Sequence, residues 1–157
     1  SITDGQIYLD KRLFASGVLP AIDVTKSVSR VGGKGQHHRI KEKAGRMKLD
    51  YLQFLELEVF TRFGSRLEAS MEAKLARGRV LRELLKQDRL APMPIAFHLA
   101  WLTGFQHGLF DKVPVTSIPA LLGYLAARVE ESDLTLESRE KEWTDTVSHW
   151  LDQHMAT

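Results

Sequence analysis

Cysteine is absent from the 157 residues, which excludes a disulfide framework, a thiolate zinc site and a cysteine nucleophile. No apolar run approaches the ~18 residues of a membrane-spanning helix, and the N-terminus lacks the regions of a signal peptide, so we expect a soluble protein. The net charge of +2 is too small to argue for nucleic acid. With 43% apolar residues, the length suits one domain with a real core.

Motifs for a self-sufficient active site are missing as well. The GGKG at Gly32–Gly35 lacks the spacing of a GxxxxGK[ST] phosphate loop and the buried strand that precedes one. The six histidines contain no HExxH pattern, so we expect no metal site. Ser27 and Ser29 have no acid and histidine positioned for a hydrolase triad. The sequence therefore predicts that this protein alone does not hydrolyse a nucleoside triphosphate.

The first 24 residues carry extended patterns. Ile7 and Leu9 alternate with polar neighbours, and Pro20 opens a short run that contains Ile22. We expect two short strands joined by a loop through residues 11–19. Because two strands do not form a stable sheet alone, we expect the edge of a larger α/β sheet and a fragment of a longer polypeptide.

After Gly35 the apolar period becomes helical. We expect five amphipathic helices joined by short loops, with a smaller helical piece at 37–44. Gly64 is expected to end the first of the five, and Ser65 with Glu68 to form a capping box for the second. The residues expected on the five helix faces are, in sequence order, Leu52, Leu55, Val59, Phe63; Leu67, Met71, Leu75, Leu85; Ile95, Leu99, Leu102; Leu121, Leu122, Leu125, Val129; and Leu136, Trp143, Val147, Trp150, Leu151.

Charge is unevenly distributed. Residues 34–48 hold six lysines and arginines against Glu42 alone, whereas residues 130–142 are mostly acidic. A basic run of this kind can bind phosphates, and a helical module that grips an acidic partner or nucleic acid through 34–48 is one functional alternative. The other interpretation is a solvated helix face or a surface that meets an acidic partner subunit, because no aromatic residue is interleaved for base stacking.

The loop Ser27–Gly33, SVSRVGG, is too small to form a core. Its glycines and hydroxyls can fix the backbone, which leaves Arg30 as the one long side chain that the loop presents. Arg30 either caps a helix or pairs with a carboxylate, or it acts on a nucleotide held by another subunit. For action on a nucleotide, its always-charged, planar guanidinium suits the charge that develops on a transferring γ-phosphoryl group.

Five segments, in order, resemble the last third of the alpha subunit of rotary (F-type) ATP synthases. They are SITDGQIYLD at Ser1–Asp10, PAIDV at Pro20–Val24, SVSRVGG, LLKQ at Leu84–Gln87 and APM at Ala91–Met93. The resemblance implies a mainly α fold: a short β-strand remnant of a nucleotide-binding α/β domain at 1–33, then an all-helical C-terminal domain of five to six helices at 34–157. The segment KGQHHRIKEKAG departs from the family pattern and suggests a divergent or second copy.

The resemblance also assigns roles near the catalytic site. The position of Arg30 looks across the alpha–beta interface into the catalytic site on beta. Ser27 matches a position required for activity, and Ser1 and Gly5 match positions that line the same catalytic phosphate region.

A second nucleotide contact is implied after LLKQ. There the family contacts the nucleotide of the non-catalytic site, and the matching residues are Gln87, Asp88 and Arg89. The family's usual second glutamine is replaced by Arg89. The alternative for this segment is a plain helix C-terminus with a basic residue that favours the helix dipole.

Function, as the resemblance implies it, belongs to a complex. The alpha subunit is the regulatory, non-catalytic member of an alternating alpha3-beta3 ring, with beta, gamma and other alpha subunits as partners. ATP or ADP with Mg would be the cofactors of the full complex, with none bound to the fragment. The complex couples ATP synthesis to hydrogen-ion or other ion transport as a translocase. The implied location is peripheral, at the cytoplasmic face of a bacterial inner membrane or its organelle equivalent.

Overall fold

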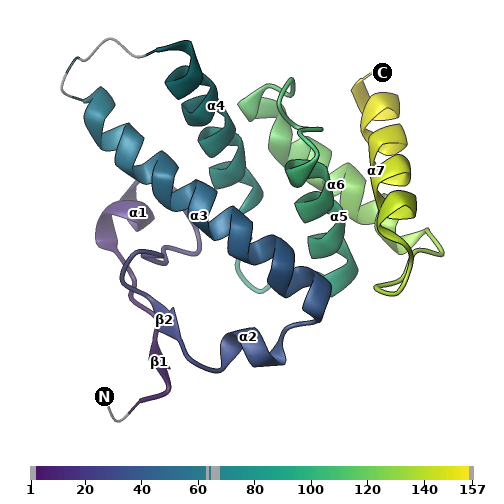
Figure 1. Ribbon diagram of the computed structural model, residues 1–157, viewed down its shortest axis with the longest axis horizontal. Helices are drawn as coiled ribbons and strands as arrows, with labels where there is room; N and C mark the ends of the chain where they lie inside the picture. Colours follow the sequence, from purple (N-terminus) through teal and green to yellow (C-terminus); the bar gives the residue numbers. More distant parts are fainter. Residues whose placement is uncertain (1–2, 63, 65–67, 156–157) are drawn as a thin grey trace.

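The computed structural model describes residues 3–62, 64 and 68–155, and these are mainly helical (Figure 1). A small N-terminal segment precedes an array of long helices. In sequence order the elements are β1 (Gly5–Gln6), α1 (Lys11–Ala15), β2 (Val28–Ser29), α2 (Gly32–Gly35), α3 (His38–Thr61), α4 (Ala69–Leu84), α5 (Ile95–Gln106), the 3₁₀ turn η1 (Val115–Ser117), α6 (Ile118–Glu130) and α7 (Glu140–Met155). The expected fold class, a short strand remnant followed by a helical domain, is confirmed.

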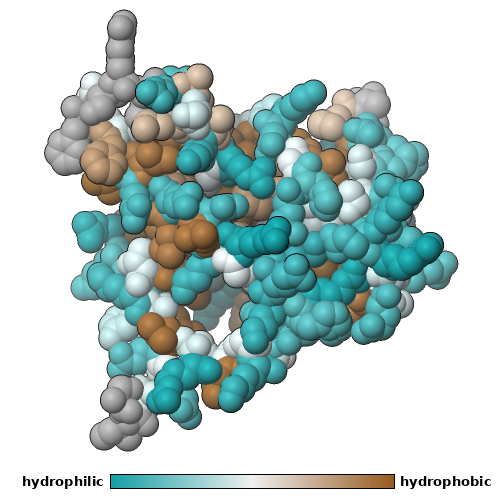
Figure 2. Space-filling view, viewed as in Figure 1, coloured by the Kyte–Doolittle hydropathy of each residue, from teal (hydrophilic) through white to brown (hydrophobic). Residues whose placement is uncertain are grey.

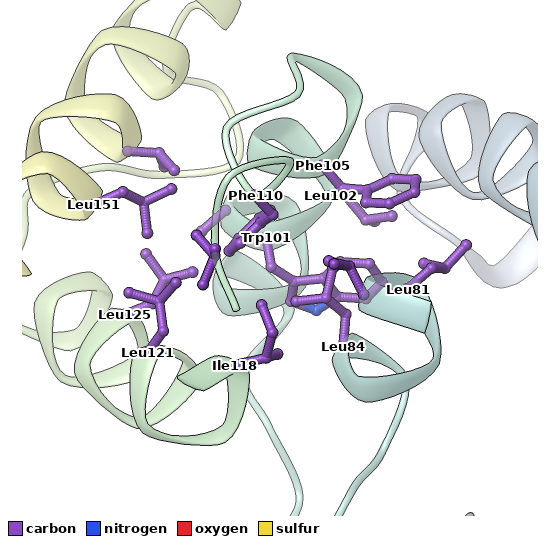
Figure 3. Packing of buried hydrophobic residues seen from close by; sticks show 14 of the residues in the cluster. Leu81, Leu84, Trp101, Leu102, Phe105, Phe110, Ile118, Leu121, Leu125 and Leu151 are labelled. Carbon is purple, nitrogen blue, oxygen red and sulfur yellow. The ribbon is translucent and has the colours of Figure 1, made fainter. Parts of the chain in front are cut away.

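The helix α5 lies at the centre of the array and packs against α3, α6 and α7. Its sequence IAFHLAWLTGFQ has no lysine, arginine or carboxylate, and residues 97 and 99–105 are all buried. A helix that is apolar all round is expected to be surrounded by other elements. Figure 3 shows Trp101, Leu102 and Phe105 of α5 among the leucines of α4, α6 and α7.

The long helices α3 and α4 form a close pair. Gly78 of α4 leaves room for the ring of Phe54, since a Cβ atom there would lie 2.1 Å from that ring. Arg82 donates from both Nη atoms to Glu58, at 2.8 and 2.6 Å, and this hydrogen bond lowers the pKa of Glu58 despite its partial burial. The pair is therefore fixed by a close crossing and by a two-pronged ion pair.

The helical expectations hold for element type and less well for boundaries. The piece expected at 37–44 is not separate, because α3 runs unbroken from His38. Its buried residues include Tyr51 and Phe54, whereas Val59 of the expected face is 54% exposed. The aromatic-bearing face is thus the buried one. Leu136 lies in the loop before α7, partly buried against the core, and not in the helix.

The capping box expected at Ser65 and the apolar residues Phe63 and Leu67 lie outside the described residues. The next helix begins at Ala69, with Glu68 as its N-cap residue. Gly64 follows the end of α3 with a φ of +76°, which agrees with its expected role as a helix stop.

The N-terminal segment differs from the expected strand–loop–strand pattern. The loop expected at 11–19 contains α1, because Asp10 accepts hydrogen bonds from the amides of Arg12 and Leu13 and so caps a helical turn. The partner of β1 is β2, inside SVSRVGG, and the run after Pro20 contributes only a single bridge between Leu9 and Ile22. Both differences come from side-chain and backbone hydrogen bonds that apolar alternation does not reveal.

Candidate functional site

The loop that bears Arg30 is one arm of a short antiparallel pair of strands. Gly5 pairs with Ser29 and Gln6 with Val28. Gly5 has to be a glycine, because a Cβ atom there would lie 2.5 Å from the carbonyl oxygen of Val28. The N-terminal turn around Gly5 and the SVSRVGG loop are thus in direct backbone contact.

Three hydrogen bonds fix the backbone around Arg30. The Arg30 amide donates to the Asp4 carbonyl at 2.9 Å. The hydroxyl of Ser29 accepts from the Gly32 amide at 2.9 Å, and the hydroxyl of Ser27 accepts from the Tyr8 amide at 3.0 Å. The loop is small but well determined by its own main chain, as its serines and glycines predict.

The Arg30 side chain is exposed, and no described residue accepts a hydrogen bond or an ion pair from its guanidinium. Of the alternatives raised by the sequence, capping of a helix and pairing with a carboxylate within the described residues are therefore not seen. Ser27 is half-buried and bridges to the residues after β1 through Tyr8. Ser1, expected to line the same region, lies outside the described residues.

The segment Gln87–Arg89 is a loop after α4 and not part of the helix. The Gln87 amide donates to the Leu19 carbonyl at 2.9 Å, and its side chain donates from Nε2 to the Ala91 carbonyl at 2.8 Å. The side chains of Asp88 and Arg89 are exposed. The Leu19 contact joins this loop to the N-terminal segment, a connection that no sequence pattern indicated.

Gln87 and Asp88 border a cavity of about 680 Å³, which we call the helix-junction cavity. Its walls come from α3, the end of α4, α5 and α6, with Gly17 and Leu19 at its edge. Burial lowers the pKa of His98, which lines it, so the imidazole is neutral near pH 7. Arg30 is not among the residues that line this cavity, so the two expected nucleotide contacts are separate sites.

Two cations of the basic run at 34–48 form hydrogen bonds and ion pairs within the protein. Arg39 donates from Nη1 to the carbonyls of Leu136 and Ser138, and from Nη2 to Glu140 at 3.0 Å. Lys43 is buried and donates to Glu140 at 2.5 Å and to Gln106 at 3.0 Å. Burial raises the pKa of Glu140, but Lys43 and Arg39 lower it more, so the carboxylate stays charged.

The sequence did not single out Glu140 as the partner of the basic run. The acidic character of residues 130–142 was the signal that could have indicated such a contact. The basic residues of the run that remain exposed are Lys34, Lys41, Arg46 and Lys48. Arg39 and Lys43 contact Glu140 and are therefore not free to bind a phosphate, as the alternative interpretation of this segment would require.

Metal ligands and membrane-spanning helices are the two remaining features that bear on function. Within residues 3–62, 64 and 68–155, no group of three or more histidines and carboxylates could hold a metal ion. Over the same residues, no helix combines the length and apolarity that crossing a bilayer would require.

Comparison with known proteins gives a consistent answer. The family described as the ATP synthase alpha/beta chain, C terminal domain, matches residues 36–156. The sequence is 55% identical to "ATP synthase subunit alpha 1" of Legionella pneumophila strain Paris and 52% identical to the protein of that name from Hahella chejuensis, each over 96% of its length. It is 48% identical to "ATP synthase subunit alpha 3" of Paraburkholderia xenovorans over 83% of its length.

The matches cover 31%, 30% and 24% of those relatives, so the sequence spans less than a third of the curated proteins it resembles. The resemblance to the C-terminal portion of alpha subunits is nevertheless confirmed along almost all of its length. This polypeptide belongs to the family of C-terminal domains of ATP synthase alpha and beta subunits.

Proposed function

We propose that this protein is the C-terminal part of the alpha subunit of an ion-translocating ATP synthase and that it supplies Arg30 to the catalytic site of a neighbouring beta subunit. Its identity to alpha subunits along 96% of its length supports the assignment. The partners are then beta, gamma and further alpha subunits, in a soluble sector attached to the membrane sector on the cytoplasmic side. The numbered names of the relatives agree with a second copy of the enzyme in the source organism.

We place the boundary between the end of the nucleotide-binding domain, 1–33, and the helical domain, 34–157. The family match that begins at residue 36 supports this division. The backbone supports it too, since β2 ends at Ser29 and the long helices begin at His38.

The observation that carries the role of Arg30 is its exposed guanidinium, unpaired among the described residues, on a backbone that is fixed by hydrogen bonds. A surface arginine contributes little to the stability of its own subunit even where it meets a carboxylate. A side chain that is held at its base and free at its tip can instead reach a group on another subunit. Ser27, Gly5 and Ser1 would serve this arginine by shaping the strand pair and lining the phosphate region.

MgATP bound on beta would supply the reacting γ-phosphoryl group. Arg30 would hold its guanidinium near the equatorial oxygens, where negative charge develops in the transition state. Its two parallel N–H donors fit two of those oxygens, and a single ammonium cannot reproduce that geometry. The phosphate loop and the Mg ligands would come from beta, and the arginine would act in trans.

The test is Arg30→Lys in the assembled enzyme. Turnover should fall by about three to five orders of magnitude, the range for an arginine finger. Nucleotide binding on beta should change far less, because the contact strengthens in the transition state. Arg46→Lys is the matched control: Arg46 is an exposed arginine on α3, and its substitution should leave turnover unchanged.

The melting temperature of the 157-residue protein separates this role from a structural one. Arg30→Lys should leave it unchanged, because the guanidinium has no partner among the described residues. Near-normal turnover together with a clear loss of stability would make Arg30 a structural residue and would refute the assignment.

A second proposal concerns Gln87, Asp88 and Arg89, which would contact the base of a nucleotide at the non-catalytic site. Gln87 and Asp88 border the mouth of the helix-junction cavity, next to Leu19. The mouth offers amide and carboxylate acceptors, and the one lysine in its lining, Lys86, pairs with Glu83 at 2.7 Å. It fits a base and not a triphosphate, whose remaining contacts would come from elsewhere in the complex.

In the assembled enzyme, Gln87→Ala should weaken nucleotide binding at the non-catalytic site by about 2- to 12-fold, which corresponds to one hydrogen bond of about 0.5–1.5 kcal/mol. Gln53→Ala, at an exposed position of α3, is the matched control and should have no effect. Occupancy can be measured by equilibrium binding of a labelled nucleotide. Equal occupancy in the two variants would leave Gln87 as a plain loop residue.

A further inference from the structure

The inner part of the helix-junction cavity has no role in the function proposed above. Its volume of about 680 Å³ falls within the range of sites for drug-sized molecules. Of the residues that line it, Gln87 and Asp88 are exposed, whereas Leu84, Phe97 and Trp101 are buried. The remaining walls are helical and reach from α3 across α5 to α6.

The inner walls are apolar and partly aromatic. They are formed by Ile40, Met47, Leu84, Phe97, Trp101 and Leu122. Figure 3 shows Trp101 with Leu84, Leu102 and Ile118 where α4, α5 and α6 meet. The walls of the cavity therefore differ from the surface over α5–α7 on the face shown in Figure 2, most of which is hydrophilic. Such walls favour an apolar, planar guest.

The charges at the cavity define the guest further. Its lining contains two carboxylates, Glu83 and Asp88, and one cation, Lys86. Lys86 pairs with Glu83, and no described residue pairs with the side chain of Asp88. His98 is neutral near pH 7. The cavity therefore carries one uncompensated negative charge and disfavours an anion.

We propose that the helix-junction cavity is a binding site for an uncharged or singly cationic aromatic small molecule, seated between α3, α5 and α6. This proposal does not depend on nucleotide contact by Gln87–Arg89. It also excludes nucleotides as the guest of the inner cavity, because their phosphates carry the disfavoured charge.

Two fluorescent probes with the same kind of ring system test the charge preference on the 157-residue protein. N-phenyl-1-naphthylamine is uncharged, and 1-anilinonaphthalene-8-sulfonate adds a sulfonate. The uncharged probe should show saturable binding with one site, at least about fivefold tighter than the anionic probe, or ~1 kcal/mol. Energy transfer from tryptophan to the bound probe provides a second readout, since Trp101 lines the cavity.

Two glycine substitutions test the location. A Cβ atom at Gly123, which lines the cavity, or at Gly45, which does not, meets no atom within 4 Å. Gly123→Phe should fill the cavity and weaken probe binding by at least about tenfold, whereas Gly45→Phe should leave it unchanged. If Gly123→Phe fails to fold, Ala44→Phe on the opposite wall gives the same test.

Three results would overturn the proposal: no saturable binding of the uncharged probe, equal binding by the Gly123 and Gly45 variants, or displacement of the probe by millimolar ATP. The last result would assign the whole cavity to a nucleotide. Retained binding in the presence of ATP, lost only in the cavity-filling variants, supports a separate site.

Discussion

The N-terminal segment and the helical array are stabilised in different ways. Among the described residues before α3, Ala21 is the one buried hydrophobic, and every other buried hydrophobic lies at Ile40 or beyond. Ile7 is 71% and Leu9 74% exposed, whereas Trp143 and Phe110 are fully buried. The segment gets its shape from main-chain hydrogen bonds and caps, and the array from a continuous apolar core (Figures 1 and 3).

This difference separates function from stability along the sequence. The hydrophobic effect scales with buried apolar area, so substitutions in the array change the free energy of unfolding. The segment before α3 contributes little of that area, yet it carries the residue proposed for catalysis. Substitutions there should change local order or activity and leave global stability almost unchanged.

The largest stability effect is expected at the α3–α4 crossing. In Gly78→Ala the new Cβ atom would lie 2.1 Å from the Phe54 ring, so the ring or the helix has to move. The free energy of unfolding should fall by about 1–3 kcal/mol, measured by urea titration, even though alanine is the better helix former.

Gly45→Ala is the matched control for that crossing. Gly45 is an exposed residue of α3, and a Cβ atom there meets nothing within 4 Å. This variant should gain about 0.5–1 kcal/mol. Two alanine variants with the same sign of effect would contradict the packing described at Gly78.

A smaller effect is expected where α3 meets the start of α7. Glu140→Gln removes the carboxylate that accepts from Arg39 and from the buried Lys43, and His107 lies 3.6 Å from the same oxygen that Lys43 contacts. The free energy of unfolding should fall by about 1–2 kcal/mol near pH 7. Glu137→Gln is the control, because Glu137 is 81% exposed and pairs only with His37 among the described residues.

The pH dependence of stability gives a second readout for Glu140. Its pKa is lower in the folded state, so its contribution is present above the unfolded glutamate pKa of about 4.3 and is lost as pH falls through the lower folded value. The difference in stability between the protein and Glu140→Gln should therefore shrink as the pH is lowered through that range. A constant difference would mean that the charge of Glu140 is not what stabilises the contact.

The helices were predictable where the apolar periodicity is strong, but the residues at which they begin and end were not. The array of five helices follows from apolar spacing and from Gly64, Pro94 and Pro119. The buried face of α3 was not predictable, because Tyr51 and Phe54 are selected by their fit to α4, where Gly78 and Arg82 contact Phe54. Tertiary packing overrides the simplest period count in such cases.

The residues of the candidate site were predictable from sequence motifs, but their contacts were not. The sequence singled out Arg30 and Gln87, and the structure adds the backbone contacts of each, to Asp4 and to Leu19. The pairing of Glu140 with Lys43 could not be predicted, because the charge pattern identifies the basic and acidic segments but not which of their residues are in contact. The helix-junction cavity had no signal in the sequence at all.

The smallest effect on global stability is expected from Asp23→Ala, in the turn before SVSRVGG. One carboxylate oxygen of Asp23 accepts from the amide and hydroxyl of Thr25 and from the amide of Lys26, and the hydrogen bond from Thr25 is the main reason that the pKa of Asp23 falls to about 2. Its support of the turn is thus present above the unfolded aspartate pKa and lost only as the pH falls toward 2.

In Asp23→Ala the free energy of unfolding, measured by urea titration, should change by less than about 0.5 kcal/mol, because the turn adds little to the core. Hydrogen exchange at the Tyr8 and Arg30 amides should nevertheless become faster, since both amides bond across the strands that this turn connects. Asp10→Ala, which removes the cap of α1, is the control and should speed exchange at Leu13 but not at Arg30. Unchanged exchange at Arg30 in the Asp23 variant would show that the strand pair and the contact with Asp4 hold the Arg30 backbone without the turn.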